Sequence, residues 1–522
     1  HPFMYNQPSS FDELNSTEPV LRLVLGGYTA LAESAWMGIA QASEVLTSLR
    51  PAPGVGWRMK LPRWPRMRGQ NLLTRSFSAA EASLILMVSF LLAAALGALR
   101  QVLFNAYFGA GMEASAFYAA FRLPDVLFSL VAGTALAGAL IPVLLTTVNQ
   151  QGEQAGAQLI NRVLSTLLIL FAGLILLFES LAPWFVRTLL APGFDPATSQ
   201  LTVTLTRIML VQPLLLVLGS LISAVLNSRD QFLLTSLALL SHNLGLIGGI
   251  LLAGLIPGLG IYGPAVGVVG GALLQLVILL PGWRALGLRF CWQWPGRDPG
   301  LRQVLRLLIP NGLSVGVSYG CFVLDTAFAT LAAESAALAA DYNAWLLVGL
   351  LVALIGQAIG QAIFPRLAVH AEAADWPSVR RTLGTSLLWV IGSALLALLL
   401  LISGGRAAIT FLFELGQFDA ADGDLTYRLL VLYALGLPAY VSVEVLTGGL
   451  LALRDARTPL FTNVAQLALR ALILTLFIER LGVQAIPLAF VSTAFLEALT
   501  LGVVLWRTLS RFTRSSAYAL VA

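Results

Sequence analysis

The stretch RLPDVLFSLVAGTALAGALIPVL, residues 122–144, combines two opposite charges with a long apolar run. Arg122 and Asp125 stand three positions apart around Pro124, so in a helix they lie one turn apart and can pair. Because proline has no N–H to donate, it is favoured in the first turn of a helix. The pattern predicts a helix that begins near Pro124, with the two charges either stabilising its first turn or facing a polar space inside the protein.

A similar pattern recurs 223 positions later, in ALIGQAIGQAIFPRL at residues 353–367. At this offset Gly133 falls on Gly356 and Pro142 falls on Pro365. Further along the chain, LNSRD and LALRD are separated by nearly the same interval. Two matches at one offset indicate a duplicated unit, although close packing of helices would by itself also explain the small residues.

The whole chain is apolar, since 58% of its 522 residues are hydrophobic and 11% are charged. A soluble protein of this size needs about a quarter of its residues charged to cover its surface. The apolar residues instead form blocks that are long enough to cross about 30 Å of hydrocarbon. Their number predicts an all-α polytopic membrane protein with about twelve transmembrane helices between residues 77 and 509.

The duplication divides these helices into two lobes of six, at residues 77–290 and residues 291–522. Because an even number of crossings returns the chain to its starting side, the two lobes run parallel. Parallel repeats around an axis along the membrane normal are typical of transporters, which hold their substrate between the halves. The sequence therefore predicts a polar site at the lobe interface.

Arginines predict the orientation, since Lys60 is the only lysine in the chain. If the basic stretch before residue 77 is cytoplasmic, the loops on the opposite side hold only a few arginines, such as Arg187, Arg406 and Arg480. Positively charged loops remain in the cytoplasm, so the N-terminal linker and the C-terminus are both predicted to be cytoplasmic. This asymmetry accounts for the net charge of +5, and no nucleic-acid partner is expected.

The first 76 residues differ from the rest in composition. Residues 1–50 contain an apolar stretch at 20–49, whose three charges are eleven positions apart and share one stripe of a helix. Such a helix could cross the membrane, lie in its interface or dock on a partner protein. The last two arrangements are favoured because they keep Glu33 out of the hydrocarbon. Residues 51–76 are basic, rich in proline and contain tryptophans, which suits a linker lying on anionic membrane lipids.

Sequence signatures of catalysis and metal binding are absent. The chain has three histidines and two cysteines, and the cysteines fall in a predicted loop (Cys291) and a predicted helix (Cys321). No phosphate-binding loop, nucleophile elbow or dinucleotide fingerprint occurs. The sequence therefore predicts neither an enzyme nor a cofactor or metal site.

Ionisable residues inside membrane helices are costly, so each of them is a candidate for function. Asp325 has no basic neighbour in sequence, so it could hold a cation or pair across helices with Arg470 or Arg207. Arg100 could face a cavity or reach the lipid headgroups by snorkelling. The residues expected to face a substrate cavity are Arg100, Arg122, Asp125 and Arg207. Those expected to be interior charges or ion ligands are Asp325, Glu444, Arg470 and Glu497.

Longer motifs resemble those of a known family. The stretch ALRQVLFNAYFGAGMEASAFYAAFRLPDVLFSLVAGTALAGALIPVL is similar to the first two helices of the MurJ (MviN) lipid II flippases, which belong to the MOP exporter superfamily. Similar motifs follow at APWFVRTLLAPGF, AVLNSRDQF, GQAIFPRL and LRDARTPLF. The resemblance covers residues 71–511.

The resemblance implies two six-helix lobes that rock around a central cavity in the bacterial cytoplasmic membrane. It implies a lipid-linked substrate, whose pyrophosphate meets cationic residues as the peptidoglycan precursor moves between leaflets. Arg100 stands at one of the two arginine positions of the family's first helix, beside the retained Gly97.

Several positions depart from the family pattern. Ala94 and Phe128 stand where the family has cavity arginines, and Ser115 stands where it has an aspartate. Leu346 and Gly349 stand where an arginine and a glutamate line the family's cavity. The loss of three arginines removes charge-assisted bonds to a pyrophosphate. The chain is also expected to lack the family's thirteenth and fourteenth helices.

Three functions are compatible with these observations. The motifs favour a flippase-type transporter that moves a polyprenyl-pyrophosphate-linked saccharide, lipid II or a relative, by alternating access. The alternative is a transport-inactive scaffold subunit, docked into a larger membrane complex through residues 20–49. A less favoured third function is export of a small amphiphile, coupled to an ion at Asp325 or Glu444.

Overall fold

A computed structural model describes residues 77–521, apart from residues 78, 132, 133, 295, 297, 333 and 456. Within this part of the chain the regular secondary structure is helical, without strands. The helix expected within residues 20–49 and the linker at residues 51–76 lie outside the described residues.

The helices follow the order expected for two sets of six membrane segments. The first lobe contains α2 (Ala79–Phe108), α3 (Met112–Ser129), α4 (Thr134–Gln151), α5 (Glu153–Phe185), η2 (Val186–Leu190), α6 (Pro196–Met209), α7 (Gln212–Asn227), α8 (Leu233–Leu255) and α9 (Tyr262–Ala285). The second lobe contains α10 (Pro299–Thr330), α11 (Ala337–Leu351), η3 (Val352–Gln357), α12 (Ala358–Glu372), α13 (Trp376–Phe413), α14 (Ala420–Ala434), α15 (Leu437–Ala452), α16 (Arg457–Leu481), η4 (Gly482–Gln484) and α17 (Ala485–Val521). The second and fourth segments of each lobe are interrupted, as α3–α4, α6–α7, α11–α12 and α14–α15. This shared pattern of interruptions fits a duplication.

Eight helical runs in the described residues are long and apolar enough to cross a membrane, and the bent pair α14–α15 makes nine. The run Arg457–Phe512 holds both α16 and α17, which pack against each other and so form two segments. The broken segment α3–α4 and α10, whose apolar stretch Val315–Thr330 is short, complete the expected twelve. The prediction of an all-α polytopic membrane fold is confirmed.

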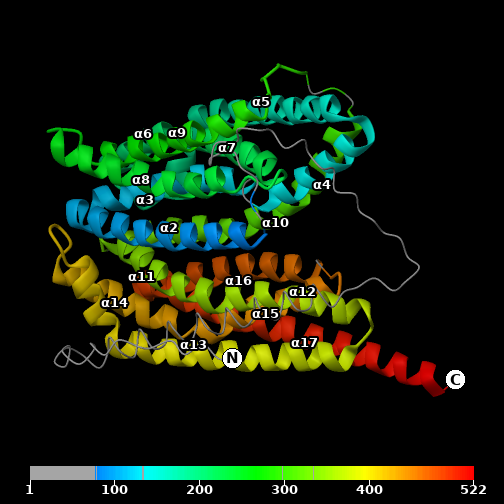
Figure 1. Ribbon diagram of the computed structural model, residues 1–522. Helices are drawn as coiled ribbons and strands as arrows, with labels where there is room; N and C mark the ends of the chain where they lie inside the picture. The colour runs from blue at the N-terminus through cyan, green and yellow to red at the C-terminus, as the bar shows by residue number, and fades with distance from the viewer. Residues whose placement is uncertain are drawn as a thin grey trace, which may run out of the picture. The chain divides into compact units, whose positions relative to one another are not determined.

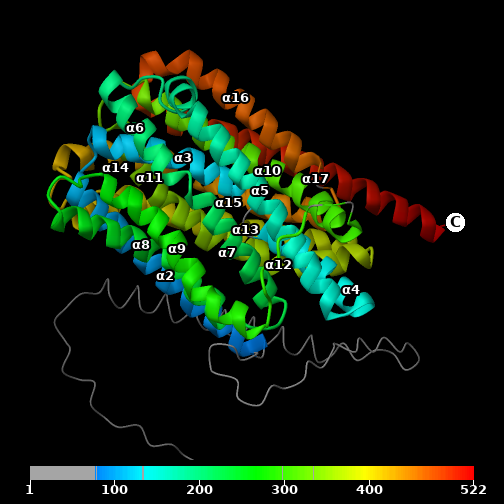
Figure 2. The same cartoon turned by 90° about the horizontal axis from the view of Figure 1, so that it is seen from above.

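The two lobes form two layers, with α2 to α9 in one and α11 to α17 in the other (Figure 1). Seen from above, α16 and α17 lie along one border of these layers, and α8 and α9 lie along the opposite border (Figure 2). Helices α2, α5, α8, α10, α13 and α16 finish at the same end of the bundle, which we call the closed end. The opposite end, which carries most of the arginines, is called the arginine-rich end.

Helix α3 begins at Met112, directly after Gly111, and not near Pro124. The preceding turn requires glycine, because Gly109 has a φ of +63°. Pro124 therefore lies inside the helix, which ends soon afterwards at Ser129. The prediction of a helix start at Pro124 is wrong, since the glycine turn starts the helix earlier and the proline weakens its last turns.

Helix α10 contributes to the cores of both lobes. In its first half, Leu301, Val304 and Leu308 are buried in a hydrophobic cluster formed with α4, α5 and α7. A side chain at Gly312 would lie 3.1 Å from the carbonyl carbon of Leu130, so α10 and the end of α3 are in close contact there. The second half of α10 also contacts the second lobe, where Asp325 pairs with Arg470 on α16 and Phe322 packs near Trp345 on α11.

Helices α8 and α9 are held close together by small residues. A Cβ atom added to Gly249 would lie 2.8 Å from Cα of Gly267, and Gly245 and Gly271 leave similarly little space. Glycine at such contacts lets two membrane helices approach closely enough for extensive van der Waals packing. This pair forms the border of the first lobe.

Candidate functional site at the lobe interface

Four polar side chains connect the two lobes at the closed end, and we call them the interlobe amide cluster. Gln101 and Asn105 on α2 both donate to Oδ1 of Asn343 on α11, over 2.8 and 3.1 Å. Gln101 also lies 2.7 Å from the hydroxyl of Tyr118 on α3. All four side chains are buried, so these bonds form away from water, where the loss of a partner is expensive.

Main-chain contacts hold the lobes together beside this cluster. The N–H of Gln417 in the second lobe donates to the carbonyl of Ala106 on α2 over 2.9 Å. The hydroxyl of Ser115 donates to the carbonyl of Ser335 over 3.1 Å. A Cβ at Gly109 would lie 2.7 Å from the carbonyl oxygen of Gln417, so the chains touch at that point. The lobes are therefore in direct contact at this end.

Arg122 extends from α3 across the interface toward the second lobe. Its Nε donates to the hydroxyl of Thr326 on α10 over 2.8 Å. Its guanidinium carbon lies 5.6 Å from the ring centre of Phe322 and 5.7 Å from that of Tyr342. Arg122 does not form an ion pair with Asp125, although their spacing allows one, because the arginine side chain points across the interface. Aromatic faces stabilise a cation without neutralising it.

Arg470 and Asp325 form the interior ion pair that the sequence left open. Nη1 of Arg470 lies 3.3 Å from Oδ2 of Asp325, and their side chains are 1% and 5% exposed. The guanidinium also lies over the ring of Phe490, 3.6 Å from its centre. Three buried atoms of this pair have no hydrogen-bond partner: Oδ1 of Asp325, and Nε and Nη2 of Arg470.

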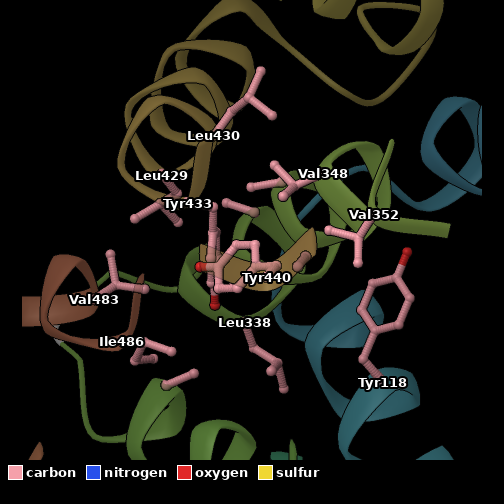
Figure 3. Close-up of a cluster of buried hydrophobic side chains, with 14 of the residues drawn as sticks. Tyr118, Leu338, Val348, Val352, Leu429, Leu430, Tyr433, Tyr440, Val483 and Ile486 are labelled. Atoms are coloured by element: carbon pink, nitrogen blue, oxygen red, sulfur yellow. The ribbon is translucent and has the colours of Figure 1, made fainter. Parts of the chain in front are cut away.

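A second buried carboxylate lies in the same part of the second lobe and was not among the predicted sites. Asp341 on α11 accepts a hydrogen bond of 2.8 Å from the hydroxyl of Tyr433 on α14. Tyr433 and Tyr440 lie close together among aliphatic side chains such as Val348 and Ile486 (Figure 3). Asp341 follows directly after an alanine-rich stretch at the closed end, where the sequence gives no sign that the helix has already entered the core.

The two remaining predicted carboxylates have neutral partners. Glu444 on α15 is 3.4 Å from the amide nitrogen of Gln357. Glu497 on α17 is buried and accepts a hydrogen bond of 3.1 Å from the hydroxyl of Thr462 on α16. The structure therefore places both in the second lobe, in separate contacts.

The other two predicted cavity residues lie in different surroundings. Nη1 of Arg100 donates to Oδ1 of Asn243 on α8 over 3.3 Å, so this partly buried cation has a neutral partner. Arg207 lies away from the interface, where its side chain is 46% exposed and 3.5 Å from the carboxylate of Glu179 on α5. The structure brings Arg122 and Asp325 close to the interface but does not bring Arg207 to it.

Residues at three of the positions that depart from the family pattern make packing or hydrogen-bond contacts. Ser115 takes part in the main-chain contact between the lobes. Phe128 packs against the hydrophobic core of the first lobe. Gly349 would place a Cβ 3.6 Å from the indole nitrogen of Trp345. These contacts are apolar or neutral, so none of them supplies a cation in place of the family's charged residues.

A pocket of about 1030 Å³ adjoins the start of α10 and is lined by Thr166, Arg302 and Arg306, among others. No three histidine, cysteine, aspartate or glutamate side chains of the described residues gather as metal ligands.

Two parallel six-segment lobes, joined at one end around buried charges, define a polytopic membrane transporter. Solved structures share this fold. A structure described as an inward-facing MATE family transporter of the MOP superfamily aligns with a TM-score of 0.70 and 13% identity, over 83% of this chain and 99% of that chain. Another, described as lipid II flippase MurJ in an inward closed conformation, aligns with a TM-score of 0.67 and 20% identity, over 84% of this chain and 91% of that chain.

The family model described as lipid II flippase MurJ matches residues 104–521, and the chain therefore belongs to the MurJ family. A protein of Rhizobium tropici described as a probable lipid II flippase MurJ is 27% identical over 416 residues, which are 79% of this chain and 78% of the relative. The lipid II flippase MurJ of Burkholderia cenocepacia is 29% identical over 419 residues, which are 79% of this chain and 80% of the relative. These matches confirm the family that the motifs predicted.

Proposed function

We propose that the protein is a flippase that moves a polyprenyl-pyrophosphate-linked saccharide, lipid II or a relative, across the bacterial cytoplasmic membrane. The observation that carries this proposal is the pairing of two parallel lobes, in contact at one end, with the cation Arg122 held between them. The membership of the MurJ family supplies the class of substrate. Transport would proceed by alternating access, in which contacts at the closed end break as contacts at the opposite end form.

Arg122 and Arg100 are the proposed contacts for the pyrophosphate. No ion pair of the described residues involves either side chain, so their charges are available to an anionic ligand. A guanidinium donates two parallel hydrogen bonds to phosphate oxygens, which suits a diphosphate. Asp125, one turn from Arg122, would orient the guanidinium when it leaves Thr326. Arg207 is not part of this proposal, because Glu179 holds it on the outside of α5 and α6.

The proposed orientation places the closed end at the outer face of the membrane. Arginines in the loops or at the helix ends of the opposite end include Arg229, Arg284, Arg381 and Arg454, and the positive-inside rule places such ends in the cytoplasm. The linker at residues 51–76 and the C-terminus would then be cytoplasmic. In this orientation the lobes are closed to the outside.

A depletion and rescue experiment tests the proposal. The chain is expressed in bacteria whose own lipid II flippase is depleted, and we expect growth and peptidoglycan synthesis to be restored. Arg122→Ala should abolish rescue at normal membrane levels, and Arg100→Ala should weaken it. Arg207→Ala is the matched control and should rescue as well as the unchanged protein. Normal insertion without any rescue would contradict the proposal.

A protein partner for residues 20–49 is a separate proposal that rests on their amphipathic sequence. Deletion of residues 1–50 should then release the protein from a larger assembly in native gels of solubilised membranes. An unchanged migration, apart from the lost mass, would contradict it.

A further inference from the structure

The interior of the second lobe holds an unbalanced set of charges, which we call the second-lobe charge cluster. Its members are Asp325 on α10, Asp341 on α11, Arg470 on α16 and Tyr433 on α14. The cluster has two carboxylates and one guanidinium, so it carries one excess negative charge when both carboxylates are ionised. Each of the four side chains is buried.

The contacts assign the single cation to Asp325. Arg470 lies within ion-pairing distance of Asp325, at 3.3 Å, and no ion pair of the described residues involves Asp341. Asp341 receives one neutral hydrogen bond, from Tyr433. A buried carboxylate without a cation is strongly disfavoured, and it regains neutrality by binding a proton. Asp341 is therefore the member of the cluster suited to hold a proton.

The fourth charge near this cluster comes from the other lobe. Arg122 on α3 is bonded to Thr326, the residue that follows Asp325, and its guanidinium lies beside the ring of Tyr342, the residue that follows Asp341. The charges that act on Asp341 are those of Asp325, Arg122 and Arg470. Contact between the lobes thus brings a compensating cation to Asp341, and separation removes it.

We propose that Asp341, hydrogen-bonded to Tyr433, is a proton-binding site whose occupancy is linked to the separation of the lobes. A proton from water at the closed end forms an O–H bond with the free carboxylate oxygen of Asp341 when Arg122 withdraws. The same proton returns to water when Arg122 comes back and favours the ionised carboxylate. No other bond forms or breaks. Because one proton binds more tightly to the separated state, acid favours separation at the closed end.

The groups around Asp341 come from four neighbouring helices. Tyr433 on α14 bonds to it directly, and the charged groups that act on it are Asp325 on α10, Arg122 on α3 and Arg470 on α16. Asp125 is one turn from Arg122 but forms no ion pair with it. On α11 itself, Trp345 packs on Phe490 with ring centres 4.4 Å apart, and this apolar contact limits water near the cluster.

Infrared difference titration of the full chain in nanodiscs tests the site without a lipid substrate. We expect a carboxylic acid C=O band that titrates in the unchanged protein and is lost in Asp341→Asn. Arg122→Gln should raise the proton affinity of this band by a factor of about ten, because a compensating cation is removed. Tyr433→Phe should also raise it, because the ionised form loses its hydrogen bond. Glu497→Gln, which alters a buried carboxylate bonded to Thr462, should leave the band unchanged.

A band that survives in Asp341→Asn, or that has the same midpoint in Arg122→Gln, would overturn the proposal. If Asp341→Asn does not fold, the titration midpoints of the band in Arg122→Gln and Tyr433→Phe test the proposal, since both variants keep the carboxylate.

A distance measurement tests the link to lobe separation. Spin labels at Gln200→Cys and Ala421→Cys, in a Cys291→Ser background, report on exposed positions of the two lobes at the closed end. The population of the longer distance should rise as pH falls, and Asp341→Asn should keep it high at every pH. A pH-independent distance in the unchanged protein would overturn the link. The inference rests on the proposed alternating access, but rescue of growth with a pH-independent distance would reject the link between the proton and lobe separation and keep the flippase.

Discussion

Arg470 and Asp325 form a buried ion pair that joins the fifth segment of the second lobe to its first, with 3.3 Å between the charged atoms. In the first lobe, Arg100 and Asn243 make the corresponding connection, between α2 and α8. Both lobes therefore have a polar link between the same two segments, as a duplication would predict. In the second lobe that link is charged and fully enclosed.

Breaking the buried pair should destabilise the protein strongly. Arg470→Met leaves Asp325 without its cation in the core, and we expect a loss of about 3–5 kcal/mol in unfolding free energy. The double variant Arg470→Met/Asp325→Leu removes both charges and should recover most of this loss. Unfolding in mixed micelles measures four proteins: the unchanged protein, Arg470→Met, Asp325→Leu and the double variant. Equal losses in the double variant and in the sum of the single ones would show that the two side chains do not interact.

A disulfide across the closed end should stop transport. Ala106 and Gln417 are joined by a main-chain hydrogen bond, so cysteines at these positions in a Cys291→Ser background should cross-link on oxidation. Cells that depend on the double-cysteine protein should stop growing under oxidant and resume with reductant. Each single-cysteine protein is a control that cannot cross-link. Continued growth with fully cross-linked protein would contradict alternating access.

Removing the central acceptor of the interlobe amide cluster should loosen the closed end. Asn343→Leu removes the acceptor that Gln101 and Asn105 share across the interface, so the buried Nδ2 of Asn105 loses its partner while Gln101 keeps its bonds within the first lobe. We expect oxidation of the Ala106/Gln417 cysteine pair to slow several-fold. Asn161→Leu is the matched control, because Asn161 is also buried but bonds within the connection at the arginine-rich end, to Arg289. Equal cross-linking rates in both variants would show that the cluster does not hold the lobes together.

The contact between α8 and α9 gives a prediction with a control one residue away. Gly249→Val should destabilise the first lobe by about 1–3 kcal/mol, because its side chain meets the backbone of α9. Gly248→Val should have little effect, since a Cβ there meets nothing within 4 Å. Thermal unfolding in detergent compares the two proteins. A similar loss for both would mean that the helices can move apart at low cost.

The apolar blocks and the two matched motifs were sufficient to predict the membrane fold and its two lobes. The cost of charge in hydrocarbon also indicated Asp325 and Arg470 as interior charges, but only the structure shows that they pair with each other. The sequence could not show in which direction each charged side chain points. Arg122 and Asp125 are correctly spaced to pair, yet the arginine turns toward Thr326 because aromatic faces of the other lobe are in reach.

Two features gave no signal in the sequence. Gln101, Asn105 and Asn343 are uncharged, so nothing in their type marks them as a contact between lobes 238 or more positions apart. Asp341 lies near a predicted loop and is recognisable as a core residue only when Tyr433 is placed beside it. Such pairings depend on tertiary packing, which a single sequence does not encode in any local pattern.

Helix α10 gives the protein a mechanical constraint, because its first half is buried in a first-lobe cluster while its second half contacts the second lobe, through the Asp325–Arg470 pair and the rings of Phe322 and Trp345. If the halves of this helix stay with their cores, the lobes cannot swing as two independent rigid bodies. The relative movement of the lobes would then require α10 to bend between Gly312 and Cys321, where Gly316 and Gly320 have no side chains to resist bending. The stiffness of those three turns would then limit how far the lobes can separate. A longer side chain at Gly320 would reduce that separation.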